Sequence, residues 1–244
     1  MHADDPPALL WRLPASERIP LLASCDRVLL QRGEVLAMRH RPTPCVYFPV
    51  DCAVTLLVPE NGRRLEVALV GNEGMVGVEV CGPVGAPAWD AVCAIPGSAL
   101  RLRTERFHEV TLHAPRLREA IGRFEWVLGA DLAARVACVR FHSLLQRLAG
   151  WLLMATQRCG HGPLRVTQAD LAAWLGVRRA GVTHALRWLD SRHCIEVRRG
   201  RLRVLDERML ADHGCSCHAA SEGRYEHVFG GGALRGVPLA TTLR

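Results

Sequence analysis

Residues Val166–Leu189, VTQADLAAWLGVRRAGVTHALRWL, have the pattern of two helices joined by a tight turn. Thr167 and Asp170 have the spacing of a capping box, in which each side chain accepts a hydrogen bond from an unpaired amide at the helix start. Gly176 supplies the left-handed residue that ends this helix. A second helix is expected to begin near Arg178, because apolar residues then recur at helical spacing. Its buried stripe is expected to comprise Val182, Ala185, Leu186 and Leu189.

The remaining face of the second helix carries mostly basic and polar side chains. Two short helices, a glycine turn and an exposed basic face are typical of a helix-turn-helix that reads DNA in the major groove. An ordinary helical hairpin with a solvated face is the alternative. The helix cap, the glycine turn and the exposed basic face all indicate a helix-turn-helix, which disfavours that alternative.

Two short strands are expected directly after these helices. Cys194–Val197 and Arg201–Leu205 flank Arg198-Arg199-Gly200, which predicts a basic hairpin tip. Such a tip would make the module a winged helix whose arginines contact phosphates across the minor groove. The residues expected to contact DNA are Thr167, Gln168, Arg178, Arg179, Ala180, Thr183, His184, Arg187, Arg198, Arg199, Gly200 and Arg201.

This region resembles the Crp/Fnr family of bacterial transcription regulators. The resemblance rests on T-Q-x-D-L-A-x-x-L-G-V at Thr167–Val177, on R-x-x-V-x-x-A-L-R-x-L at Arg179–Leu189, and on the sequence IEVRRGRLRVL that follows. It extends backwards into an effector-like β domain and a linking helix, and it covers most of residues 20–210. The resemblance implies a homodimer bound to a palindromic operator in double-stranded DNA, with RNA polymerase as a further candidate partner.

The resemblance also implies which side chains read bases. Family members commonly present an Arg, then a Glu, and a second Arg further along the helix; the matching positions here are Arg179, Ala180 and His184. Arg179 keeps the planar fork that holds guanine O6 and N7 together. Ala180 cannot accept a hydrogen bond from cytosine, and His184 offers at most one directed contact. We therefore expect a half-site unlike the best-known family sequence.

The positive charge of the chain is concentrated in the same region. The formal net charge is +7, and all 31 basic residues are arginines. Of these, 14 lie between Arg135 and Leu210, against 5 of the 24 acidic residues. Because binding to phosphates releases counterions from DNA, this distribution favours a nucleic-acid partner for the C-terminal region.

Two features bear on the cellular location. The sequence has no run of about eighteen apolar residues, the length that a membrane-spanning helix needs. Its first residues, MHADDPPALLWRLP, lack the basic-then-apolar pattern of a signal peptide. We therefore expect a cytoplasmic protein with no membrane partner.

Short apolar runs alternate with Gly, Pro and Asn between Val28 and Leu102, after a short helix expected over residues 8–22. Asn61-Gly62 between two of these runs predicts a tight hairpin. Evenly spaced short strands predict a double-sheet jelly roll, in agreement with the cyclic-nucleotide-binding-like domain that the resemblance implies. The strands are expected at Val28–Leu30, Val35–Ala37, Val46–Val50, Ala53–Val58, Leu65–Val70, Met75–Val78, Ala91–Ile95 and Ala99–Leu102.

A jelly roll is also the scaffold of cupin metalloenzymes, which need several inward His residues and a carboxylate. His40 is the only His between Val28 and Leu102, so the ligands for such a site are missing. We therefore expect no enzyme activity and no cofactor.

A long helix is expected from Pro115, since proline suits the first helical position. Its large apolar residues are spaced by three or four and form one continuous stripe. The resemblance implies that this helix joins the domains and pairs with its twin in a homodimer. The alternative is that the stripe packs on its own β domain, and the a/d-like spacing favours the dimer. The residues expected at the interface are Leu117, Ile121, Phe124, Leu128 and Leu132.

The expected effector pocket departs from that of the cyclic-nucleotide sensors in the family. Those sensors hold the phosphate with a Gly-Glu turn, a short helix, and an Arg followed by a small hydroxyl residue. Gly77-Val78-Glu79 matches the first part loosely, but residues 65–100 contain no Arg, Lys or His. Without a cation the phosphate would depend on backbone amides alone, so we expect no tight binding of a cyclic nucleotide. Met75 and Trp89 could line a site for an uncharged effector or belong to the core.

Ten cysteines are scattered along the chain without Cys-x-x-Cys spacing, so most are expected to be buried free thiols. The oxygen-sensing relatives hold an iron–sulfur cluster with several N-terminal cysteines, whereas this chain has only Cys25 there. We expect no bound metal. Cys215, Cys217 and His218 are the weaker candidates for a Zn²⁺ ligand set, and the alternative is a frayed tail with free thiols.

Together these features predict an α+β chain with an N-terminal antiparallel jelly roll, a long dimerisation helix and a C-terminal winged helix-turn-helix. The expected units are a β-roll sensor (1–113), a linking helix (114–137), a DNA-binding domain (138–212) and a flexible tail (213–244). The predicted function is a homodimeric, sequence-specific DNA-binding regulator whose effector is not a cyclic nucleotide. The alternative is a non-catalytic sensor or scaffold that acts through protein partners.

Overall fold

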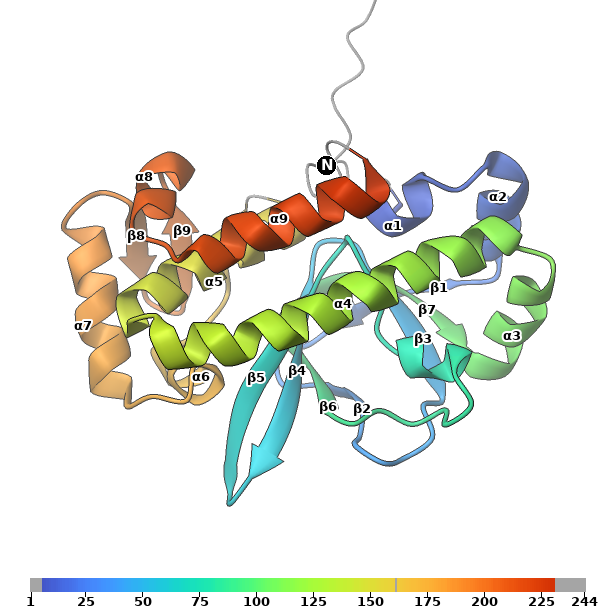
Figure 1. Ribbon diagram of the computed structural model, residues 1–244, viewed down its shortest axis with the longest axis horizontal. Coiled ribbons are helices and arrows are strands. Elements are labelled where there is room, and N and C mark those ends of the chain that lie inside the picture. The colour runs from blue at the N-terminus through green and yellow to red at the C-terminus, as the bar shows by residue number, and fades with distance from the viewer. Residues whose placement is uncertain (1–5, 161, 231–244) are drawn as a thin grey trace, which may run out of the picture.

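Two antiparallel sheets form the N-terminal part of the chain (Figure 1). The computed structural model describes residues 6–160 and 162–230. One sheet has the strand order β1-β7-β3, and the other has the order β2-β6-β4-β5. This confirms the predicted α+β class, with the antiparallel sheets ahead of the long helix and the C-terminal helical module. The strands are β1 (Asp26–Leu30), β2 (Val35–Ala37), β3 (Cys45–Pro49), β4 (Ala53–Glu60), β5 (Arg63–Val70), β6 (Asp90–Ile95) and β7 (Gly97–Arg103).

Two turns in the β domain decide where its predicted strands form. Asn61 and Gly62 both have positive φ and join β4 to β5, as the sequence predicted. The strand predicted at Met75–Val78 is wrong, because only Val76 pairs, in an isolated bridge with Tyr47. Gly77 then turns the chain with a φ of 93°, and the 3₁₀ helix η1 (Val78–Cys81) follows.

Helices α1 (Ala8–Trp11) and α2 (Ala15–Ala23) precede the sheets, and α3 (Thr104–Leu112) follows them. The single helix predicted over residues 8–22 is therefore two helices. Pro14 separates them, since the residue before a proline is disfavoured in a helix. Leu10 and Leu21 are fully buried, so both helices pack on the β domain.

Helix α4 (Pro115–Phe141) crosses the whole molecule and has three differently covered faces (Figure 1). Proline occupies its first turn, as predicted, and the helix runs four residues beyond the expected end at 137. One face packs on the β domain and a second packs on the C-terminal helix α9. The third face is exposed and carries Gly122, Trp126, Gly129, Ala133, Val136 and Arg140.

These faces bear on the predicted dimer interface, which stays a prediction. Leu117, Ile121, Phe124 and Leu128 are buried within this chain, and Leu132 is partly buried against the same β-domain core. In this chain the β domain covers them, so a dimer seam on the same residues would require α4 to move away from that domain. Large apolar residues on a helix mark whichever surface buries most area, and here that surface is intramolecular.

The C-terminal module is a helical bundle with a two-stranded wing. Three of its helices begin with a side chain that accepts a hydrogen bond from a first-turn amide, and two of these caps are Ser143 on α5 and Asp206 on α8. The capping box of Thr167 and Asp170 starts α6, and Gly176 ends that turn with a φ of 66°, as the sequence predicted. The elements are α5 (Leu144–Cys159), α6 (Gln168–Trp174), α7 (Arg179–Asp190), β8 (Ile195–Arg198), β9 (Arg201–Val204) and α8 (Glu207–Asp212).

The outer face of the four-stranded sheet and the C-terminal module share one core. Leu57 on β4 and Leu69 on β5 belong to the same buried cluster as Trp151 and Leu152 on α5. The indole Nε1 of Trp151 donates to the buried carboxylate of Glu66, 2.9 Å away. The two parts of the chain therefore meet through a buried surface as well as through the linking helix.

Helix α9 (Ser216–Phe229) corrects the expectation of a flexible tail. It lies alongside α4 in the opposite direction, and its His218, Ser221 and Tyr225 are buried (Figure 1). Arg224 and Ser221 both contact Asp131 of α4, at 2.5 Å and 2.7 Å. The rest of the predicted tail, residues 231–244, lies outside the described residues.

Candidate nucleic-acid interface

Helix α7 is amphipathic, and its polar face is open. Val182, Ala185, Leu186 and Leu189 are buried, as predicted from their spacing. The side chains on the opposite face are exposed, and they carry most of the predicted DNA contacts. The exposed residues are Arg178, Arg179, Ala180, His184 and Arg187.

The start of α6 lies beside this face. Thr183 Oγ1 of α7 donates a hydrogen bond to Gln168 Oε1 over 2.6 Å, which holds the two helices together at their polar edge. The hydroxyl of Thr167 is occupied by the capping box, where it accepts from the Asp170 amide. Among the predicted contacts, Thr167 therefore has a structural role, whereas Gln168 and Thr183 are half-buried at the rim of the exposed face.

The wing is an exposed basic hairpin. Arg199, Gly200 and Arg201 are exposed at its tip, where Gly200 has a φ of 70°. Arg198 is also exposed but pairs with Glu196 at 2.6 Å, and this hydrogen bond raises the pKa of Arg198. An exposed pair of this kind is weak, so a phosphate can compete for the guanidinium. The Val197 amide donates to Asp190, which ties the wing to the end of α7.

The residues of the expected effector region are placed in the core. Met75 is buried and Trp89 partly buried. Glu79 accepts a hydrogen bond from Thr43 Oγ1 over 2.5 Å, so its carboxylate is already engaged. Arg39 and Arg41, on the neighbouring loop, have exposed side chains.

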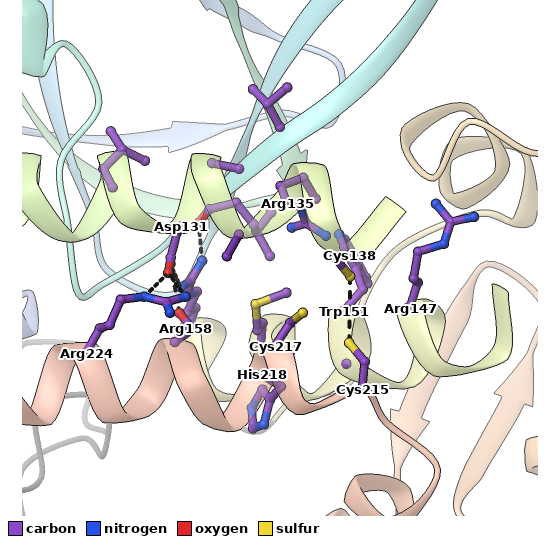
Figure 2. A pocket seen from close by; sticks show the side chains of 18 of the residues that line it. Asp131, Arg135, Cys138, Arg147, Trp151, Arg158, Cys215, Cys217, His218 and Arg224 are labelled. Atoms are coloured by element: carbon purple, nitrogen blue, oxygen red, sulfur yellow. Dashed lines mark hydrogen bonds and ion pairs between the residues drawn. The ribbon is translucent and has the colours of Figure 1, made fainter. Parts of the chain in front are cut away.

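Four side chains near the C-terminal end of α4 form the one group within the described residues that could hold a metal ion: Cys138, His142, Cys215 and Cys217. His218, a candidate from the sequence, is not among them, because its Nε2 bonds to Gln157 Oε1 and the ring points away from the sulfurs (Figure 2). Hydrogen bonding with Cys138 lowers the pKa of Cys215 to about 5.

Sequence reasoning found two of these four residues. It missed Cys138 and His142, which lie more than seventy residues earlier in the chain. Their Cys-x-x-x-His spacing puts both on one face of a helix, and this is the signal that could have drawn attention to them.

The likeness to known proteins is confined to one domain in sequence and extends to most of the chain in structure. The Crp-like helix-turn-helix domain family matches residues 146–213. No curated protein matches the sequence.

Solved structures of several bacterial regulators have a similar fold. FixK2 from Bradyrhizobium japonicum is 16% identical, with a TM-score of 0.65 over 78% of this chain and 98% of FixK2. TTHB099, a CRP-family transcriptional regulator from Thermus thermophilus, is 18% identical, with a TM-score of 0.60 over 78% of this chain and 97% of that one. The c-di-GMP-responsive global regulator CLP from Xanthomonas campestris is 16% identical, with a TM-score of 0.57 over 78% and 99%.

At such low identity the solved structures establish the fold, while the sequence match establishes the DNA-binding module. None of the helices in residues 6–160 and 162–230 combines the length and apolar character needed to cross a membrane. Residues 146–213 match the Crp-like helix-turn-helix domain family, and the fold of the chain is similar to that of solved regulators of the CRP family.

Proposed function

We propose that this chain is a cytoplasmic, non-enzymatic transcription regulator that binds a palindromic operator as a homodimer. The observation that carries the proposal is the open face of α7, where Arg178, Arg179 and Arg187 are exposed beside the basic wing. A recognition helix in the major groove needs such a face, and a wing tip with arginines supplies phosphate contacts.

The competing proposal is a sensor or scaffold that acts through protein partners. The clustered arginines of α7 and the wing favour DNA, because positive charge concentrated on one face is the electrostatic mark of a nucleic-acid-binding surface. Retention on DNA that falls steeply with salt separates the two, since each phosphate contact releases counterions.

Base reading is assigned to Arg179, Ala180 and His184 at the N-terminal half of α7. Arg179 would hold one guanine through O6 and N7, and Ala180 would lie beside a thymine methyl. His184 would add at most one directed contact. The operator should then have two half-sites about 34 Å apart, each with one strongly required guanine.

Arg179→Ala should cost about 1–3 kcal/mol of binding free energy and relax the preference at that one base position. Arg199→Ala with Arg201→Ala should instead weaken all duplexes alike and reduce the salt slope by about one unit for each lost phosphate contact. Selection from randomised duplexes and salt-dependent titrations measure the two effects. Arg179→Ala with an unaltered base preference, or a wing variant that loses only the specific site, would contradict the assignment.

The same proposal includes an effector other than a cyclic nucleotide. Residues 65–100, which include the 3₁₀ turn at Val78–Cys81, contain no basic side chain to pair with a buried phosphate. Cyclic AMP and cyclic GMP should therefore leave the melting temperature unchanged. A ligand present at a hundred times its dissociation constant would stabilise the folded state by about 2.7 kcal/mol, an effect that thermal unfolding detects. A clear rise in melting temperature on addition of either cyclic nucleotide would overturn this part of the proposal.

A further inference from the structure

We propose that Cys138, His142, Cys215 and Cys217 bind one thiophilic divalent cation, and that Zn²⁺ is the ion that the ligand set fits best. Three thiolates and one imidazole are a common donor set for structural zinc. Residues 6–160 and 162–230 offer no other group of this kind. The site lies between elements that are far apart in sequence, so its formation depends on the fold.

Two elements supply the ligands in pairs. Cys138 lies in the last turn of α4, and His142 is the residue that ends this helix, so the two are stacked four residues apart. Cys215 is the residue that starts α9, and Cys217 follows in its first turn. The end of one helix therefore faces the beginning of its antiparallel neighbour, and each contributes two donors.

The distances match a tetrahedral ion. All four ligand atoms lie within 4.8 Å of one another, with Cys138 Sγ and Cys215 Sγ 3.7 Å apart and Cys217 Sγ and His142 Nδ1 3.6 Å apart. Bonds of about 2.3 Å from zinc to sulfur and about 2.0–2.1 Å to nitrogen place two sulfurs about 3.8 Å apart and a sulfur and a nitrogen about 3.6 Å apart in a tetrahedron. Figure 2 shows the sulfurs of Cys138, Cys215 and Cys217 turned toward one another.

The surroundings of the four ligands are closed on one side and open to solvent on the other. Cys138 and Cys215 are buried, whereas His142 and Cys217 are half-buried, so an ion can enter from that side. Gly150 of α5 lies beside Cys215 Sγ, and a Cβ built there would be in ordinary van der Waals contact with this sulfur, at 3.4 Å. A cavity of about 40 Å³ adjoins the group, and Arg135 on its wall would offset the net negative charge of three thiolates around a divalent ion.

A bound ion would fasten α9 to the junction between the linking helix and the DNA-binding module. His142 is followed directly by Ser143, which caps α5. The ion would therefore fix the start of α9 at the point where α4 ends and α5 begins. Any effect of the ion on DNA affinity rests on the proposed function, but binding of the ion itself does not.

The test uses the full-length protein, reduced, stripped of metal with a chelator and titrated with Zn²⁺ or Co²⁺ alone. One equivalent of Co²⁺ should give the visible and near-ultraviolet bands of tetrahedral thiolate coordination, and Zn²⁺ should abolish them. Zn²⁺ should also raise the melting temperature and slow tryptic cleavage after Arg224 in α9. Cys215→Ser with Cys217→Ser should lose the bands, and Zn²⁺ affinity should fall by more than the roughly 10–100-fold typical for loss of a supporting residue.

Two control variants test whether the four proposed residues, and not their neighbours, are the ligands. Cys81→Ser removes an exposed thiol outside the group and should retain full binding. His142→Asn should weaken Zn²⁺ binding, whereas His218→Asn should not, because His218 is bonded to Gln157. Reduced wild-type protein that binds no Co²⁺, bands that persist in the double variant, or a Cys138–Cys215 disulfide as the only change in this group would overturn the proposal. Since no DNA is present, its failure is distinguishable from failure of the proposed function.

Discussion

Replacing Arg158 with Met should lower the free energy of unfolding by about 3–5 kcal/mol, because it leaves a buried carboxylate without its cation. Arg158 is only 3% exposed, and its Nε lies 3.2 Å from Glu73 Oε1. Glu73 is equally buried, and its other bonds are to the Gly71 amide. Such a loss would consume much of the total stability of a typical domain.

The size of the effect also reflects how many elements meet at this side chain. The Arg158 guanidinium donates to the Leu69 carbonyl of β5 and lies 3.7 Å from Asp131 of α4. It also lies over the ring of Tyr225 of α9, 5.8 Å from the ring centre. Figure 2 shows Arg158 beside Asp131 and Arg224. One arginine on α5 thus joins the sheet, the linking helix and the C-terminal helix. Gly71 is required beside it, since a Cβ there would come within 2.4 Å of the Arg158 Cβ.

A second substitution separates the unpaired charge from lost packing. Arg158→Met with Glu73→Gln removes both charges and should recover most of the stability, since a buried ion pair replaced as a whole costs little. Urea unfolding followed by tryptophan fluorescence measures each variant, with an unchanged slope as the sign of an unchanged native state. A single variant within about 1 kcal/mol of wild type, or a double variant no better than the single one, would contradict this account.

The pH dependence of the single variant follows from the direction of the Glu73 pKa. Burial raises this pKa even with Arg158 in place, and loss of the cation removes an opposing influence. A carboxyl group whose folded pKa is raised destabilises the folded state as pH rises from its unfolded value, about 4.3, through the folded value. The loss of unfolding free energy in Arg158→Met should therefore become smaller as pH falls from the folded pKa of Glu73 toward its unfolded pKa. Arg158→Met with Glu73→Gln should lack this trend.

Local chemistry explains which parts of the fold could be predicted from the sequence. Thr167, Asp170 and Gly176 act on backbone groups within a few residues, so the start and end of α6 follow from them directly. Asn61-Gly62 works in the same way for the β4–β5 hairpin. In each case the partners are neighbours along the chain, and no tertiary contact has to be known.

Helix α9 and the metal-ligand group depend on distant partners, so the sequence does not display them. The buried face of α9 includes His218 and Ser221, which are polar and therefore weaken an apolar pattern. Their partners Gln157 and Asp131 lie on α5 and α4. Cys138 and His142 likewise have the chemistry of ligands only because α9 brings two more thiols to them. The expectation of no metal rested on spacing along the chain, which gives no information on ligands that only the fold brings together.

The dimer interface stays a prediction, but the residues chosen for it from the sequence lie against their own β domain. The expected stripe was chosen for its large apolar residues, and the β domain buries those. The exposed stripe instead contains small residues between Trp126 and Val136, which are 57% and 73% exposed. Its members alternate in steps of four and three, the spacing of a coiled-coil seam: Gly122, Trp126, Gly129, Ala133, Val136 and Arg140. We therefore place the proposed two-fold contact between copies of α4 on this stripe.

Trp126→Asp and Val136→Asp should each convert the dimer to a folded monomer. A carboxylate on a two-fold seam lies near the same carboxylate of the second copy, which repels it, and dimerisation would also remove its hydration. Light scattering should report half the molecular mass of the wild-type dimer. The melting temperature should lie close to that of wild type at the same subunit concentration, apart from the stability that dimerisation itself adds.

Ile121→Asp is the matched control, since Ile121 is 2% exposed and packs within its own chain. It should unfold the β domain rather than release a folded monomer, because its carboxylate would be buried without a partner. The monomers made by Trp126→Asp should also lose binding to a full operator far more than to a single half-site, since two linked modules gain affinity through effective concentration. If both seam variants remain dimeric while Ile121→Asp yields a folded monomer, the seam lies on the face first predicted from the sequence, and α4 must rotate away from the β domain in the dimer.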